Sequence, residues 1–337
     1  MGTLELGAQQ AINKCIRVNK GEEVVLVTDR GTAEVADALE KVLSGLACKI
    51  HRFVMEDFGE RPEDGSNPLP FPRQIAQAYE TATVSIYAAA GRKGELKSFR
   101  VPMLNLVDSN PKVRHGHMPN VNRLIMETGM STDYDVVQQL SAKVHGIVKT
   151  ARQIRVTSPA GTDFLARFNP AWRWLISDGQ ITAEQWSNLP DGEVFTCAET
   201  ATGRAVVDGC LGDYFGREGT CETWPVIVDF KDGLVTSVRC EKRPEIQAEL
   251  EKYVKQDANA SRIGEFAIGT NVGLDRIIGV LLQDEKFPGV HIAIGHGYPE
   301  KTGSPWSSDA HLDMVLRNVT IEVDGRTIMK AGGFTIL

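Results

Sequence analysis

Residues 23–55, EVVLVTDRGTAEVADALEKVLSGLACKIHRFVM, decide the fold class of this chain. Residues 23–28 form a nearly continuous apolar run, as in a strand that is buried on both faces. Between Ala33 and Leu43 the apolar residues recur at helical spacing, and residues 49–55 show a second strand pattern. Strand, helix and strand in this order form a βαβ unit, which predicts a parallel sheet with helices on its faces.

The same alternation continues to about residue 150. It predicts helices over residues 74–81, 120–129 and 133–149, and strands over residues 83–88 and 103–106. Residues 1–150 are therefore expected to form a small doubly wound α/β domain. The sequence contains neither G-x-G-x-x-G nor G-x-x-x-x-G-K-[ST], so no nucleotide is predicted for this domain.

From about residue 150 the period changes to the alternation of strands. Tight turns are predicted at Lys231-Asp232-Gly233 and Asp324-Gly325, and a polar amphipathic helix over residues 245–256. Residues 151–337 are thus expected to form a β-rich (α+β) domain that carries a metal site. The main strands are predicted at 154–157, 163–168, 193–197, 204–208, 224–230, 234–240, 263–268, 290–294, 311–323 and 326–330.

The composition argues against several classes of protein. The chain of 337 residues has a net charge of −7 and no long run of one sign, which argues against a nucleic-acid-binding face. No apolar run approaches the roughly 20 residues that span a bilayer, and no signal-peptide pattern is present. The six cysteines include no C-x-x-C pair and are expected to be reduced thiols of a cytoplasmic protein.

Histidine and carboxylate side chains gather in the last third of the chain. His311 and Asp313 are two residues apart, a spacing that places both side chains on one face of a strand. His291 opens an apolar run, HIAI. Imidazole together with carboxylate suits Zn, Mn, Co or Fe(II) better than Ca or Mg. Taken singly, however, His291 has an ordinary interpretation as a hydrogen-bonded core residue.

Two glutamates upstream add to this set. Glu193 begins an apolar strand after the turn residues Pro-Asp-Gly, and Glu265 lies inside the apolar run IGEFAIG. A charge in such a setting either faces solvent or is compensated by a partner or a metal. Gly269 follows and would let a loop pass close to a site. With both glutamates the set exceeds what one structural ion needs, so it could hold two ions that share a bridging carboxylate.

Four segments, NLPDGEVFT, GEFAIGTN, HIAIGHGYPE and AHLDMVL, resemble in order and residue type the motifs of the aminopeptidase T family of thermophilic metalloproteases. The resemblance is good over residues 150–330 and loose before them. It implies a two-metal aminopeptidase site, a metal-activated water as the nucleophile, and a homodimer. The residues that it matches to the family's metal ligands are Glu193, Glu265, His291, His311 and Asp313. Of these, Glu265 would be the ligand that bridges the two ions. The resemblance also implies that Tyr298 stabilises the tetrahedral intermediate or completes the coordination shell.

Three further residues are candidates for substrate binding. Arg317 could clamp a substrate carboxylate bidentately, although a surface salt bridge is equally consistent with its position. Trp306 could line the pocket or cap the core. His296, between two glycines, could contact substrate or be an ordinary loop residue.

The stretch between His291 and His311 is shorter than in the family's peptidases, which leaves the substrate open between a small peptide and a small molecule. The segment HLDMVLRN also resembles the short branch of the superfamily, 2,5-dihydroxypyridine 5,6-dioxygenase. That resemblance implies one Fe(II) held by two histidines and an aspartate, with a histidine at the position of Glu265 and no acidic residue at that of Glu193. This chain keeps both glutamates, but His291 or His296 could supply a second histidine.

The predicted function is therefore a metal-dependent hydrolase of aminopeptidase type, with two Zn, Co or Mn ions as its expected cofactors. An Fe(II) ring-cleaving dioxygenase acting on a hydroxylated pyridine-like heterocycle is the alternative. A non-catalytic metal-binding relative is a third possibility.

Overall fold

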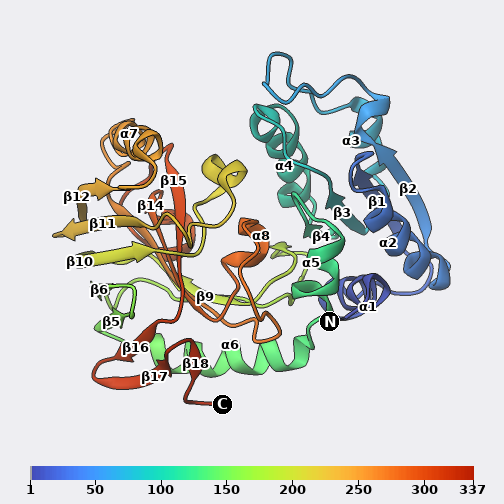
Figure 1. Cartoon of the computed structure of the whole chain (residues 1–337). Helices are drawn as coiled ribbons and strands as arrows, with labels where there is room; N and C mark the ends of the chain where they lie inside the picture. The colour runs from blue at the N-terminus through green and yellow to red at the C-terminus, as the bar shows by residue number, and fades with distance from the viewer. Residues whose placement is uncertain (1) are drawn as a thin grey trace. The chain divides into compact units, whose positions relative to one another are not determined.

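The computed structural model describes residues 2–337, which form two compact units (Figure 1). The first unit contains the chain up to Tyr134 together with Gly179–Asp191. The second contains Asp135–Asp178 and Gly192–Leu337. The units are thus not two consecutive segments, because the chain returns once to the first. Among the described residues no helix is both long and apolar enough to cross a membrane.

The first unit is built on a parallel five-stranded sheet in the order β2-β1-β3-β4-β8, which confirms the α/β prediction. Val24, Val25, Leu26 and Val27 of β1 are fully buried, as expected for a central strand covered on both faces. The elements of this unit are α1 (Leu4–Gln9), η1 (Gln10–Cys15), β1 (Glu23–Thr28), α2 (Ala33–Gly45), β2 (Lys49–Val54), η2 (Met55–Asp57), α3 (Arg73–Ala78), β3 (Val84–Ala88), η3 (Leu96–Arg100), α4 (Val101–Ser109), β4 (Arg114–His117), α5 (Arg123–Glu127), η4 (Gly129–Ser131) and β8 (Ser187–Asn188).

One strand predicted for this unit is wrong. Residues 103–106 belong to helix α4, and the strand that follows β3 in the sheet is β4. Met103 and Val107 are buried four residues apart on one side of α4, which is helical spacing. The window 103–106 is too short to separate a buried helix from a strand by its apolar content.

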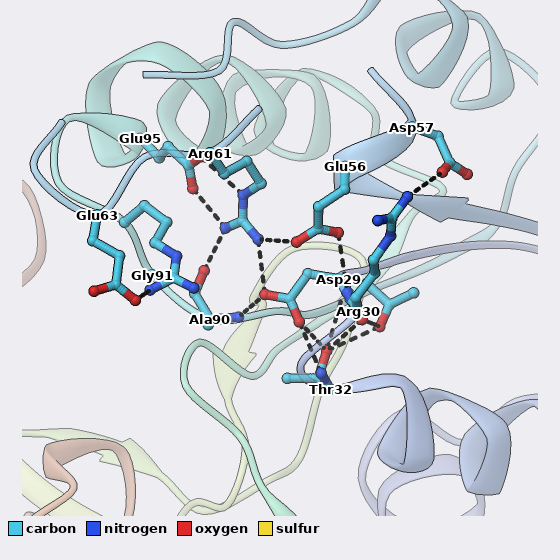
Figure 2. A network of polar contacts seen from close by, with 12 residues as sticks. Asp29, Arg30, Thr32, Glu56, Asp57, Arg61, Glu63, Ala90, Gly91 and Glu95 are labelled. Atoms are coloured by element: carbon cyan, nitrogen blue, oxygen red, sulfur yellow. Dashed lines mark hydrogen bonds and ion pairs between the residues drawn. The ribbon is translucent and has the colours of Figure 1, made fainter. Parts of the chain in front are cut away.

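An ion-pair network lies at the carboxyl ends of β1 and β3 (Figure 2). Arg61, in the loop after β2, is buried and contacts Asp29 at 2.8 Å and Glu95 at 2.6 Å. Asp29 also accepts a hydrogen bond from the backbone N–H of Ala90. This is the point in a doubly wound sheet where the strand order reverses. Glu56 is a third carboxylate on Arg61, so the guanidinium at this point is already paired within the unit.

The second unit contains two antiparallel sheets. The larger has the order β12-β11-β10-β6-β5-β16-β17-β18, and the smaller the order β15-β14-β13-β9-β7. A β-rich second part with few helices was predicted and is confirmed. Its elements are α6 (Tyr134–Val148), β5 (Gln153–Thr157), β6 (Asp163–Arg167), β7 (Leu175–Ser177), β9 (Glu193–Thr196), β10 (Thr200–Val207), η5 (Asp213–Glu218), β11 (Val226–Lys231), β12 (Leu234–Arg239), α7 (Pro244–Tyr253), β13 (Ile263–Gly269), α8 (Leu281–Asp284), β14 (Gly289–Gly295), α9 (Pro299–Thr302), β15 (His311–Leu316), β16 (Thr320–Val323), β17 (Arg326–Lys330) and β18 (Gly333–Phe334).

The continuous strand predicted over residues 311–323 is in fact two strands. β15 pairs in the smaller sheet and β16 in the larger one. The break falls at Asn318, whose φ of 51° lies in the left-handed region that a strand cannot accommodate. The chain changes sheet at this point, so one sequence segment contributes to both layers.

Apolar residues from both sheets form a single buried core. Phe266, Ile292 and Met314 come from the smaller sheet, and Val156 and Ile321 from the larger one. Since apolar side chains occupy this face of the smaller sheet, its polar residues are left to the opposite face.

Candidate metal centre

The predicted metal ligands lie on neighbouring strands of the smaller sheet. Glu193 begins β9 and Glu265 lies in β13, while His291 lies in β14. His311 and Asp313 lie in β15. The strands are adjacent in the order β15-β14-β13-β9, so residues that are far apart in the sequence meet across the sheet.

Strand alternation places all five on one face. Glu265 pairs with Ala293, and Ala293 pairs in turn with Asp313. Directly paired residues project to the same side of a sheet. The positions between the polar residues are small, because Ala293 and Ala267 carry only methyl groups there. The side chains therefore have room to converge.

The distances within this face are short. Nε2 of His291 lies 3.3 Å from Oε1 of Glu265 and 3.4 Å from Oε2 of Glu193. Nε2 of His311 lies 3.3 Å from Oδ1 of Asp313 and 3.8 Å from Oε2 of Glu265. The structure thus brings together all five residues that were predicted to bind metal, with Glu265 in contact with both histidines.

Two residues of this centre, Glu285 and Lys286, were not predicted from the sequence. Both follow α8, in the charged stretch Gln283-Asp284-Glu285-Lys286. Such a stretch is typical of an exposed turn, but here Lys286 is only 1% exposed. Its Nζ lies 2.6 Å from Oε1 of Glu193 and 2.9 Å from Oε1 of Glu285. The only signal in the sequence is the apolar run that precedes this stretch.

Three overlapping groups of side chains offer ligand atoms that lie within 4.8 Å of one another. Every group contains at least one histidine and one carboxylate, so each matches the ligand chemistry of a divalent transition metal. The groups are Glu193/Glu265/His291, Glu265/His311/Asp313 and Glu285/His291/Asp313.

The pKa shifts of the side chains in the centre reflect an excess of negative charge. Burial alone would lower the pKa of His291, but the hydrogen bond of Glu265 and the charge of Glu193 outweigh it and raise this pKa to about 9. Burial opposes protonation of His311 in the same way, and Asp313 raises its pKa to about 9. Burial raises the pKa of Glu285 to about 8, although Lys286 opposes the shift.

The side chains fit a metal on two further observations. Oε2 of Glu193 is buried and has no hydrogen-bond partner among the described residues. The raised pKa values of the two histidines and of Glu285 favour protons on these groups, which would balance part of the carboxylate charge. A bound cation would satisfy the buried oxygen and displace those protons, as expected for a metal-binding set.

Tyr298 is positioned beside the centre. It has a left-handed backbone, with φ of 51°, at the start of α9. Its hydroxyl lies 3.3 Å from Nε2 of His311, and its ring packs against the rings of His311 and Phe195. Burial, with the charge of Glu265 next, raises the pKa of the phenol well above its ordinary value. The phenol therefore keeps its proton and can donate a hydrogen bond.

The three residues predicted to bind substrate make other contacts. The ring of His296 packs at 4.9 Å against Tyr298, so this residue adjoins the centre. Trp306 is buried and lies under the guanidinium of Arg262 at 4.0 Å. Arg317 contacts Glu222 at 3.1 Å and Asp208 at 3.8 Å. These contacts agree with the interpretation of Arg317 as a salt-bridge residue.

The sequence identifies the family to which this chain belongs. Residues 134–331 match the model of the thermophilic metalloprotease (M29) family, which is more than half of the chain, so the chain belongs to this family. The predicted family is thereby confirmed. The matched segment includes every residue of the three candidate metal groups.

Individual relatives lie on two branches. The 2,5-dihydroxypyridine 5,6-dioxygenase of Pseudomonas putida is 25% identical over 216 residues, which is 60% of this chain and 59% of that enzyme. The matched part thus spans less than two thirds of that relative's length. Wild-type AmpT from Thermus thermophilus has a similar structure, with a TM-score of 0.71 at 17% identity over 99% of each chain. The structure of 2,5-dihydroxypyridine dioxygenase from Pseudomonas putida is equally similar, with a TM-score of 0.70 at 16% identity over 99% of this chain and 97% of that one. These likenesses confirm the fold, an AmpT-like arrangement of a parallel α/β part and antiparallel sheets.

Proposed function

We propose that this chain is a metal-dependent hydrolase of aminopeptidase type, which releases an N-terminal residue or cleaves a small amide. One observation carries the proposal. In the part of the chain that the structure describes, every candidate ion group has one histidine and two carboxylates, and none combines His291 with His311. Mononuclear iron dioxygenases hold their ion by two histidines and one carboxylate. A carboxylate-rich set on one sheet face supports the hydrolase better.

The residues have distinct roles in the proposed reaction. Glu193, Glu265, His291, His311 and Asp313 would hold the metal, and Glu285 offers one more carboxylate. When bound, the metal supplies an activated water at neutral pH and polarises the substrate carbonyl. Glu265 belongs to two of the groups, so it is the residue suited to bridge two ions. Tyr298 donates a hydrogen bond to the oxygen on which negative charge develops.

Metal analysis together with two assays tests the proposal. The protein is purified without added metal, its metals are quantified, and it is assayed with aminoacyl anilides and with a dihydroxypyridine under oxygen. The hydrolase proposal predicts Zn, Co or Mn and release of the aniline. A single Fe with oxygen consumption would refute it.

A second candidate is the Fe(II) dioxygenase acting on a hydroxylated N-heterocycle. Its support is the curated relative and the similar solved structure named above. Binding of metal without turnover of either substrate class would favour the third candidate, a non-catalytic metal-binding relative.

A further inference from the structure

The ammonium of Lys286 contacts two carboxylates of the centre, those of Glu193 and Glu285. It is 1% exposed, and its backbone is fixed on both sides: its N–H donates to the carbonyl of Gln283, and its carbonyl accepts from the N–H of Asn271. A lysine is almost never buried in this way unless it is paired. The ammonium is therefore buried against two carboxylates of the site face.

The loop that carries Lys286 passes directly over β13. A Cβ at Gly269 would lie 2.0 Å from the carbonyl oxygen of Phe287 and 2.9 Å from the carbonyl carbon of Lys286. Only glycine permits this approach. Gly269 pairs with Glu193 across the sheet, so the same close packing places the ammonium beside the glutamate.

The ammonium acts on two of the three candidate ion groups. Glu193 belongs to the group with Glu265 and His291, and Glu285 to the group with His291 and Asp313. Each of these two glutamates gives one oxygen to Lys286. Neither glutamate belongs to the remaining group, Glu265/His311/Asp313.

We infer that Lys286 serves as a built-in cation of the centre, which lets one divalent ion bind tightly at Glu265, His311 and Asp313 and weakens binding of a second ion at either group that contains Glu193 or Glu285. This inference rests on the proposed metal centre and determines how many ions it takes. A divalent ion at Glu193 would share that carboxylate with the buried ammonium of Lys286. Like charges that share a carboxylate repel each other.

If Lys286 instead supported metal binding, its replacement would change metal affinity in the opposite direction. If Lys286 only positions Glu193 and Glu285 as ligands, its removal should weaken metal binding, as the loss of supporting residues does. If Lys286 competes with the second ion, its removal should strengthen that binding. The two roles are therefore separable by measurement.

The test is a titration of the full chain, freed of metal by a chelator, with Mn²⁺ alone. Free Mn²⁺ is counted by its electron paramagnetic resonance signal, and bound pairs by their spin coupling. Wild-type protein should bind one equivalent tightly and a second much more weakly. In Lys286→Met the second ion should bind more tightly by about tenfold to a thousandfold, the effect that a neighbouring like charge has on a proton. Lys286→Arg, which keeps the charge, should behave as wild type.

A second variant keeps the test decisive if Lys286→Met does not fold. In Glu193→Gln the first ion should keep its affinity within a few-fold, because the tight group does not contain Glu193. Weaker binding in Lys286→Met, or loss of the tight ion in Glu193→Gln, would overturn the inference. Two equally tight ions in wild type would overturn it and leave the proposed hydrolase standing. If no ion binds to wild type at all, the proposed metal centre fails as well.

Discussion

Among the candidate ligands, Glu265 contacts both histidines and belongs to two candidate ion groups, so we expect metal binding to depend on it strongly. Replacing it by glutamine keeps the shape but removes the charge. We expect Glu265→Gln to lower metal affinity by about 10- to 100-fold or more, since supporting residues alone have effects of that size. Equilibrium dialysis with metal analysis measures it. Glu322→Gln, in β16 of the other sheet, is the matched control and should retain the metal.

In the first unit, we expect the stability of the fold to depend on Arg61. It is buried together with Asp29 and Glu95, whose side chains are 2% and 1% exposed (Figure 2). Arg61→Met would leave these carboxylates buried without their partner, so we expect the free energy of unfolding to fall by about 3–5 kcal/mol. Urea denaturation measures the change. Arg30→Met removes an exposed pair with Asp57 and should cost at most about 1 kcal/mol. Equal effects of the two changes would contradict this account of the network.

Among the structural elements, β14 shows most directly how one strand serves both core and site. Ala293 lies on the site face between Glu265 and Asp313, whereas Ile292 lies in the core. Ala293→Leu should fill the space where the ligands converge, reduce metal content and cost about 1–3 kcal/mol. Ile292→Val should cost about 0.5–1.5 kcal/mol and leave metal content unchanged. Both are measured by metal analysis and urea denaturation, and a loss of metal in Ile292→Val would show that the two faces are not independent.

We expect strand β4 to make the first unit sensitive to acid. Burial, with the charge of Arg100 next, lowers the pKa of His115 from 6.5 to about 3. Its folded pKa lies below its unfolded one, so the unfolded chain binds more protons between these values. The stabilisation is complete above pH 6.5 and is lost as the pH falls towards 3. The loss for this residue should approach about 1.4 kcal/mol per pH unit.

Hydrogen exchange of peptides from β1, β3 and β4 at pH 7.5, 6 and 5 measures this dependence. His115→Gln cannot take up the proton, so it should show a shallower decline of protection with falling pH than the wild type. Identical declines in the two proteins would show that His115 does not carry the acid sensitivity.

On the scale of the whole molecule, metal should stabilise only one of the two units. All residues of the candidate ion groups belong to the second unit. An ion that binds the folded state alone stabilises it by about 2.7 kcal/mol when its free concentration is 100 times its Kd. A chelator should therefore increase hydrogen exchange in β13, β14 and β15 and leave β1 and β3 unchanged. Equal loss of protection in both units would contradict a site confined to the second.

The sequence by itself determined the parts of the protein that depend on local pattern. The run of residues 23–28 gave a buried parallel strand, because burial on both faces requires apolar residues at every position. The turns at Asp232 and Asp324 followed from residues that tolerate a left-handed backbone, with φ of 53° and 47°. The spacing of His311 and Asp313 placed both on one strand face for the same local reason.

The tertiary structure alone decided which distant residues meet. The charged stretch that contains Lys286 has the composition of an exposed turn, and only its packing over Gly269 buries it on the site face. The break at Asn318, where the chain changes sheet, likewise depends on pairing with β5, more than a hundred residues earlier in the chain. Periodicity reports the faces of an element, but the partner of each face is fixed by packing over the whole unit. That is why the five residues predicted as ligands could be named from the sequence, whereas the lysine beside them could not.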